Sequence, residues 1–233
     1  MPLGLASNIT ACLFDLDGVI TQTAKVHARA WKEMFDAFLQ TQPQQPPFDP
    51  VNDYEQYIDG KPREDGVRSF LASRHITVPD RTIRTLAAQK DRLFLDMIHT
   101  QGVQTYEGSI QYIHAARAAG RRLAVVSSSK HTTEVLQAAK LNDRFDAQVD
   151  GIVAEREHLK GKPAPDTYLR AAQMLNRTPP QSAVYEDALA GVEAGRAGGF
   201  GLVVGVDRGG EKEALHQHGA DIVVDDLADL LKS

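Results

Sequence analysis

Four carboxylates follow apolar runs in this chain. Asp15 and Asp17 come directly after the run at 11–14, and Glu186 and Asp187 come after the run at 183–185. Carboxylates that meet raise one another's pKa unless a cation lies between them. Oxygen ligands without His or Cys favour a hard ion, and Mg²⁺ commonly takes carboxylates together with a substrate phosphate. These residues therefore predict a Mg²⁺ site that serves phosphoryl transfer.

Asp15 and Asp17 are suited to two different roles in that chemistry. A carboxylate such as Asp15 can attack a phosphate whose charge has been neutralised, which forms an aspartyl phosphate. Asp17, two positions on, lies on the same side as Asp15 if the chain is extended there. It could then protonate the leaving oxygen and later deprotonate the incoming one.

Two further segments could bind the phosphate. Ser127, Ser128 and Ser129 follow the apolar run at 123–126 and precede a helix that we expect to begin near His131. Hydroxyls and backbone N–H groups in that place form an anion site. Lys162, in the segment GKPAPD, precedes another expected helix and could supply a fixed positive charge to the phosphate.

Each of these signals also has an ordinary structural explanation. Asp-x-Asp-Gly is typical of turns, a serine run often caps a helix, and an acidic pair suits a helix N-terminus. A lysine between Gly and Pro is ordinarily a solvated loop charge. The structural explanations leave open why all four segments fall at the same edge of one predicted sheet. We therefore favour the joint functional interpretation.

The elements that must position these residues alternate along the chain. Helical spacing over 167–175 and 188–197 lies between short apolar runs that are typical of strands buried on both faces. The pattern predicts an α/β fold, a Rossmann-like doubly wound parallel sheet. Ligands in such folds bind outside the carboxyl ends of the strands. The predicted strands are 11–14, 123–126, 183–185, 202–204 and 222–224.

One long segment interrupts the alternation. Between 24 and 100 the apolar spacing is helical over 26–39, again near 67–71 and over 83–97, with a loop rich in Pro and Gln at 41–50. We expect an inserted helical cap domain at 24–100 and a catalytic core made of 1–23 and 101–233.

Composition excludes several classes of protein. The 233 residues carry a formal net charge of −5, which argues against electrostatic binding of the whole domain to nucleic acid or to an anionic membrane. The single cysteine, Cys12, excludes an intramolecular disulfide. No apolar run approaches the roughly 20 residues needed to span a bilayer, and the first residues lack the pattern of a signal peptide. We expect a cytoplasmic monomer without nucleic-acid or membrane partners.

The segment LFDLDGV at 13–19, Ser127, Lys162 and the pair Glu186-Asp187 together resemble the four motifs of the haloacid dehalogenase superfamily. In having a carboxylate at position 17, the chain resembles the phosphotransferases of this superfamily. The dehalogenases of the superfamily lack a carboxylate at that position. The segments at 19–24, 60–65 and 161–166, with His27 and Trp31, resemble the β-phosphoglucomutases in particular. That family uses Mg²⁺ to convert β-glucose 1-phosphate to glucose 6-phosphate through β-glucose 1,6-bisphosphate.

The resemblance implies a role for each matching residue. Asp15 is the phosphorylated nucleophile and Asp17 the general acid/base. The implied Mg²⁺ ligands are Asp15, the main-chain carbonyl of Asp17, Glu186 and Asp187, while Ser127, Ser128 and Lys162 bind the transferring phosphate. The implied substrate-binding residues are His27, Gly60, Lys61, Arg63, Lys90, Ser129, Lys130 and His131, and Thr23 couples cap closure to the core.

Some positions depart from the family pattern. Asp59 stands where a cap lysine is usual, and Gln22 and His131 replace Asp and Asn. These departures concern the choice of sugar and not the core chemistry. Two alternatives to a mutase stay open: a sugar-phosphate phosphatase on the same scaffold, and a non-catalytic sugar-phosphate binding module, against which the Asp15/Asp17 pair argues. A mutase and a phosphatase differ in how well the closed cap excludes water, which no single residue decides.

Overall fold

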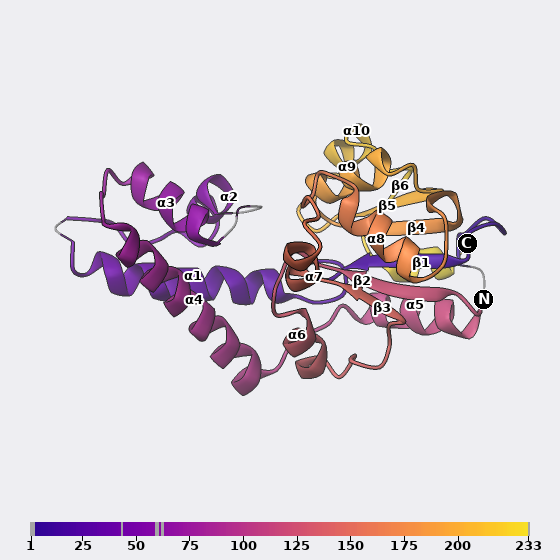
Figure 1. The fold of residues 1–233 in the computed structure, drawn as a ribbon, viewed down its shortest axis with the longest axis horizontal. Coiled ribbons are helices and arrows are strands. Elements are labelled where there is room, and N and C mark those ends of the chain that lie inside the picture. The colour runs from indigo at the N-terminus through magenta and orange to yellow at the C-terminus, as the bar shows by residue number, and fades with distance from the viewer. Residues whose placement is uncertain (1–2, 43, 59–60, 62, 233) are drawn as a thin grey trace. The chain divides into compact units, whose positions relative to one another are not determined.

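The computed structural model describes residues 3–42, 44–58, 61 and 63–232 (Figure 1). Its contacts divide the chain into two compact units. The core unit comprises Met1–Gln22 and Val103–Ser233, and the cap unit comprises Thr23–Gly102. No helix among the described residues is long and apolar enough to cross a membrane.

A six-stranded parallel sheet forms the centre of the core unit, in the order β3-β2-β1-β4-β5-β6. Its strands are β1 (Ala11–Asp15), β2 (Arg122–Val126), β3 (Ala147–Val149), β4 (Ser182–Glu186), β5 (Leu202–Val206) and β6 (Ile222–Val224). The predicted α/β parallel fold is confirmed. Its five predicted strands are present, whereas β3 was not predicted, because Gln148 interrupts its three residues.

The strand order brings the candidate residues together. β1 lies between β2 and β4, with Asp15 paired to Val126 and Phe14 paired to Tyr185. Since the strands are parallel, Asp15, Ser127 and Glu186 all reach the same carboxyl edge of the sheet. This is the edge at which open α/β sheets bind ligands.

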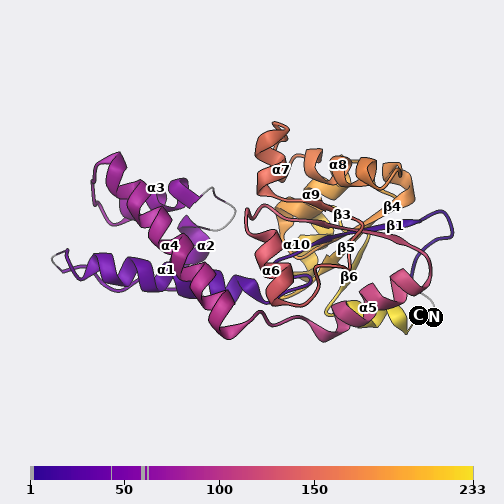
Figure 2. The ribbon, with the colours of Figure 1, turned by 60° about the horizontal axis from the view of Figure 1, so that its bottom comes forward.

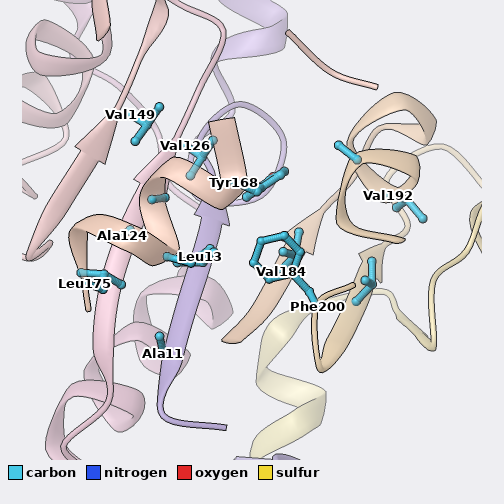
Figure 3. Packing of buried hydrophobic residues seen from close by; sticks show 14 of the residues in the cluster. Ala11, Leu13, Ala124, Val126, Val149, Tyr168, Leu175, Val184, Val192 and Phe200 are labelled. Carbon is cyan, nitrogen blue, oxygen red and sulfur yellow. The ribbon is translucent and has the colours of Figure 1, made fainter. Parts of the chain in front are cut away.

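Helices cover both faces of the sheet, and Figure 2 shows α8 on one side and α5 on the other. The core helices are α5 (Glu107–Ala118), α6 (Thr132–Ala138), α7 (Gly151–Arg156), α8 (Asp166–Met174), α9 (Leu189–Ala197) and α10 (Lys212–Gln217), with short 3₁₀ helices at Pro179–Gln181 and Leu227–Leu231. Under α8, Tyr168 packs in one buried cluster with Leu13, Val126 and Val184 (Figure 3). On β1 and β4, Phe14 stacks on Tyr185 with ring centroids 4.5 Å apart. Such packing explains why residues 11–14 and 183–185 of these strands form apolar runs.

Among its described residues, the cap unit has four helices: α1 (Thr23–Leu39), α2 (Asn52–Tyr57), α3 (Arg63–Ser73) and α4 (Asp80–Gln101). Its core is aromatic, and Phe48 packs against Phe35 at 5.2 Å and Phe70 at 5.0 Å. Phe48 comes from the predicted loop, whose described residues form no helix or strand. The short helix α2 was not predicted because its sequence, NDYEQY, has no apolar periodicity.

Candidate active site

Three carboxylates meet where β1 and β4 end. Asp15 and Glu186 are the last residues of these adjacent strands, and Asp187 follows. One oxygen from each lies within 4.8 Å of the others. Asp15 is 7% exposed and Glu186 is 1% exposed, so both carboxylates have been removed from water.

Lys162 joins this cluster from the loop before α8. Its ammonium donates to Asp15 Oδ1 at 2.5 Å and also to Glu186 Oε1. Burial opposes the ammonium's charge, but Asp15 and Glu186 outweigh it and raise the pKa of Lys162. Lys162 is therefore a permanent cation that offsets part of the negative charge.

The remaining negative charge shows in the pKa values of two aspartates. Burial raises the pKa of Asp15 well above its usual range; Lys162 lowers it, and Glu186, Asp187 and Asp17 raise it further. For Asp187, burial and the neighbouring Glu186 raise the pKa to about 8. The single positive charge of Lys162 thus does not balance the three carboxylates, whereas an added divalent cation would.

The donor set and the surrounding backbone fit Mg²⁺. All three side chains offer oxygen, the ligand type that this ion prefers. Gly18, at φ +87°, lets Asp187 approach the turn after β1: a Cβ at Gly18 would lie 1.7 Å from Asp187 Oδ2. Gly191 gives Glu186 similar room, since a Cβ there would lie 1.8 Å from Glu186 Oε1. Both glycines fit a site whose carboxylates are held close to the backbone.

Asp17 lies half-buried in a tight turn, and its carboxylate is outside the three-carboxylate cluster. The Gly18 N–H donates to the Thr21 carbonyl at 2.8 Å, and the Thr21 N–H donates to the Leu16 carbonyl at 2.9 Å. Thr21 Oγ1 donates to the same Leu16 carbonyl at 3.1 Å. Asp17 is therefore held next to Asp15 by a hydrogen-bonded turn.

The serine run both organises a helix start and reaches the site edge. Ser127 is buried directly after β2, and its Oγ accepts from the Ser129 N–H at 3.1 Å. Ser129 Oγ accepts from the His131 N–H at 3.1 Å, just before α6. Ser128 is exposed. The serines thus order the loop before α6, whose N-cap residue, His131, makes no side-chain cap hydrogen bond.

Two candidate substrate residues of the core unit have acidic neighbours. Lys130 donates to Glu155 at 2.6 Å, in a pair that is largely exposed. His131 Nδ1 lies 3.6 Å from Glu134 Oε1, one turn along α6.

In the cap unit, buried Lys90 pairs with half-buried His27. Lys90 Nζ lies 2.6 Å from His27 Nδ1, and Lys90 is only 3% exposed. The ammonium faces the rings of Trp31 at 5.3 Å and Phe94 at 4.9 Å, and His27 stacks on Phe94. Thr23 is buried at the start of α1.

The other basic candidates of the cap unit bind to cap groups. Arg63 pairs with Asp91 at 2.5 Å. Lys61 donates to the Tyr57 carbonyl at 3.0 Å and to Ser69 Oγ at 2.7 Å. Gly60 and Asp59 lie outside the described residues. Gln22 donates from its backbone N–H to the Gln104 carbonyl at 2.9 Å.

Sequence reasoning missed Tyr168 as a site residue. Its hydroxyl donates to Glu186 Oε1 at 2.9 Å, and its ring lies 5.1 Å from the Lys162 ammonium. In the sequence, Tyr168 falls on the apolar face of a helix and is indistinguishable from a core residue.

A buried aspartate beside a lysine, with two more carboxylates at the edge of a parallel sheet, is an arrangement that can support phosphoryl transfer. The profile of the haloacid dehalogenase-like hydrolases matches residues 9–199, and the chain belongs to that family. It is 48% identical to the β-phosphoglucomutase of Mycobacterium tuberculosis strain CDC 1551, over 98% of this chain and 94% of the relative. Its identity to the β-phosphoglucomutase of Bacillus subtilis is 32%, over 94% and 91%.

A solved structure of similar fold supports the same assignment. The β-phosphoglucomutase of Clostridium difficile superposes with a TM-score of 0.77 at 25% identity, over 95% of this chain and 93% of the other. The chain is thus an enzyme of the haloacid dehalogenase-like family, either a mutase or a sugar phosphatase, as the resemblance in its motifs implied.

Proposed function

We propose that the protein is a Mg²⁺-dependent β-phosphoglucomutase that works through an aspartyl phosphate on Asp15. The observation that carries the proposal is the pairing of buried Asp15 with Lys162, beside Glu186 and Asp187. Its substrate is β-glucose 1-phosphate, its product glucose 6-phosphate, and β-glucose 1,6-bisphosphate is the activating intermediate. The 48% identity to a protein named β-phosphoglucomutase supports this choice of sugar.

In the first half of the cycle, the phosphoryl group leaves Asp15. The 6-hydroxyl of β-glucose 1-phosphate attacks phosphorus, and the bond from phosphorus to Asp15 breaks. Asp17 takes the hydroxyl proton as general base. Lys162, already beside Asp15 Oδ1, stabilises the charge that returns to the carboxylate.

In the second half, the bisphosphate presents its other phosphate. An oxygen of Asp15 attacks that phosphorus, and the bond to the C1 oxygen breaks. Asp17 now returns its proton to the C1 oxygen, which releases glucose 6-phosphate and restores the aspartyl phosphate. Mg²⁺, held by Asp15, Glu186, Asp187 and the Asp17 carbonyl, would neutralise charge on the transferring phosphoryl group.

The other candidate residues would hold the substrate. Ser127, Ser128 and Lys162 would bind the transferring phosphate, and Arg63 would clamp the second phosphate, since a guanidinium can bind phosphate through two hydrogen bonds. Thr23 would couple cap closure to the placement of Asp17. The remaining proposed contacts to the sugar phosphate are His27, Gly60, Lys61, Lys90, Ser129, Lys130 and His131.

A sugar-phosphate phosphatase is the second candidate, because the matching family is described as one of hydrolases. The same Asp15 and Asp17 chemistry would serve water as the second acceptor. The mutase requires a closed cap that excludes water. In either case the proposed partner is a small sugar phosphate, and the proposed setting is a monomer in the cytoplasm that needs neither nucleic acid nor membrane.

One reaction with two readouts tests the proposal. Purified protein receives Mg²⁺, β-glucose 1-phosphate and a trace of β-glucose 1,6-bisphosphate, and glucose 6-phosphate and free phosphate are measured side by side. Glucose 6-phosphate in large excess supports the mutase, while phosphate in excess supports the phosphatase. If neither product forms, both candidate functions are contradicted. Asp15→Asn keeps the shape of the side chain without its nucleophile and is expected to abolish both products. A fully active Asp15→Asn variant would refute the assignment of Asp15 as the nucleophile.

A further inference from the structure

Arg208, after β5, contacts the turn that carries Asp17. Its Nε donates to the Gly18 carbonyl at 2.8 Å. Gly18 directly follows Asp17 and has a positive φ of +87°. The arginine side chain is 20% exposed, so this hydrogen bond is partly shielded from water.

The guanidinium is itself fixed from several sides. Its Nη1 donates to the Asp225 carbonyl at 2.9 Å, and Asp226 Oδ2 lies 3.9 Å away. The guanidinium carbon, Cζ, lies over the Tyr106 ring, 3.5 Å from its centroid. Arg208 therefore links the ends of β5 and β6 and the segment before α5 to the turn after β1.

The segment that carries Arg208 is also ordered. Asp207 Oδ1 accepts from the N–H groups of Gly209, Gly210 and Glu211 at 3.2, 2.7 and 2.9 Å. These three hydrogen bonds to one carboxylate oxygen fix the backbone beside Arg208. The arginine is thus anchored at its own end as well as at the Gly18 end.

We propose that Arg208 is a positioning residue that sets the orientation of Asp17 for proton transfer. The inference rests on the proposed role of Asp17 as general acid/base. The turn has hydrogen bonds inside it, but Arg208 holds it from outside through the carbonyl next to Asp17. A lysine ammonium has three donors but on a single nitrogen and without a planar group, so it could not hold both carbonyls from separate nitrogens and stack on Tyr106 as a guanidinium does.

The choice of leaving group separates positioning from general support of the fold. A sugar oxygen needs a proton as it leaves, whereas 4-nitrophenolate leaves well without one. We expect Arg208→Met to lower kcat on β-glucose 1-phosphate by about 10- to 100-fold with KM little changed. The variant should keep kcat/KM for release of 4-nitrophenolate from 4-nitrophenyl phosphate within about threefold of wild type. Equal losses on both substrates, or no loss on either, would overturn the inference.

A second measurement does not depend on the aryl substrate. In Arg208→Ala, added guanidinium ion should restore part of the lost kcat on the sugar phosphate, since it can occupy the space over Tyr106. Arg208→Lys should fall between wild type and Arg208→Met. Absence of rescue in a variant whose thermal midpoint matches wild type would count against the inference.

A matched control is Arg196→Met, on α9 of the same unit. That arginine is 69% exposed and its pairing partner, Asp221, is 3.7 Å away. We expect no change on either substrate. If wild-type protein turns over no phosphate ester at all, the proposed function fails; if wild type is active and the Arg208 variants match it, only the role of Arg208 fails.

Discussion

Lys162 Nζ lies 2.5 Å from Asp15 Oδ1, and the same ammonium also donates to Glu186. One buried cation is thus shared between the proposed nucleophile and a proposed Mg²⁺ ligand. Removing it would leave the carboxylates of two adjacent strands without their ion-pair partner. Such a site should favour the arrival of a second cation or of phosphate-bound Mg²⁺.

Replacing Lys162 with Met should lower kcat by about 100- to 1,000-fold, the range seen when one preorganised charge-stabilising donor is lost. Thermal unfolding followed beside the kinetics separates this effect from misfolding. Lys162→Arg, which keeps the charge, should retain more activity than Lys162→Met. Equal activity in Lys162→Met and wild type would show that the ammonium does not act on the transferring group.

The carboxylate cluster should make the metal-free protein less stable as pH rises. Folded Asp187 has a pKa of about 8, raised from 3.8 chiefly by burial, so between these values the folded chain holds a proton that the unfolded chain has released. The free energy of unfolding should fall through this window, by at most about 1.4 kcal/mol per pH unit for each such group. The raised pKa of Asp15 should lower the free energy of unfolding in the same direction as pH rises.

Denaturant titration of EDTA-treated protein at several pH values measures this slope. Asp187→Asn carries no titrating group there and should flatten it. Mg²⁺ should release protons when it binds at pH 7, which calorimetry in buffers of different ionisation enthalpy would detect. A stability that rises from pH 5 to pH 8 without metal would contradict the charge balance described here.

The fold class and the meeting of Asp15 with Glu186 could both be predicted, because strands of a parallel sheet end at one edge and those residues end apolar runs. Other features depend on contacts between distant segments. Arg63 pairs with Asp91 and Arg208 with Gly18, and no local pattern indicates either partner. Tyr168 serves the core and the site at once, so its apolar neighbours in the sequence concealed its hydrogen bond to Glu186.

Asp91 should weaken the binding of substrate by competing for Arg63. The two side chains lie 2.5 Å apart and are partly exposed, at 34% for Arg63 and 24% for Asp91. Because partly exposed ion pairs contribute up to about 1 kcal/mol, Asp91→Asn should lower KM by up to about fivefold. Initial rates over a range of β-glucose 1-phosphate concentrations measure this change.

Asp80→Asn is the control for Asp91→Asn, since Asp80 also pairs with an arginine of α3, Arg68, at 2.5 Å. We expect that control to leave KM unchanged. Arg63→Met should raise KM. If Arg63→Met binds substrate as well as wild type does, the clamp assigned to Arg63 is wrong.

Gly18 is needed for two separable reasons, its backbone conformation and its lack of a side chain. At φ +87°, any L-residue is strained, and a Cβ would also lie 1.7 Å from Asp187 Oδ2. Gly120 has a similar φ of +73°, but a Cβ there would meet nothing within 4 Å. Gly120→Ala therefore imposes comparable strain without the overlap.

Both alanine variants should lose roughly 1 to 2 kcal/mol of stability from the left-handed conformation. Only Gly18→Ala should also lose activity and Mg²⁺ affinity, because Asp187 must move away from the turn. Urea unfolding, Mg²⁺ titration calorimetry and kcat on the two purified variants test this difference. Equal Mg²⁺ affinity in the two variants would mean that the close approach of Asp187 to the turn is not needed to bind the metal.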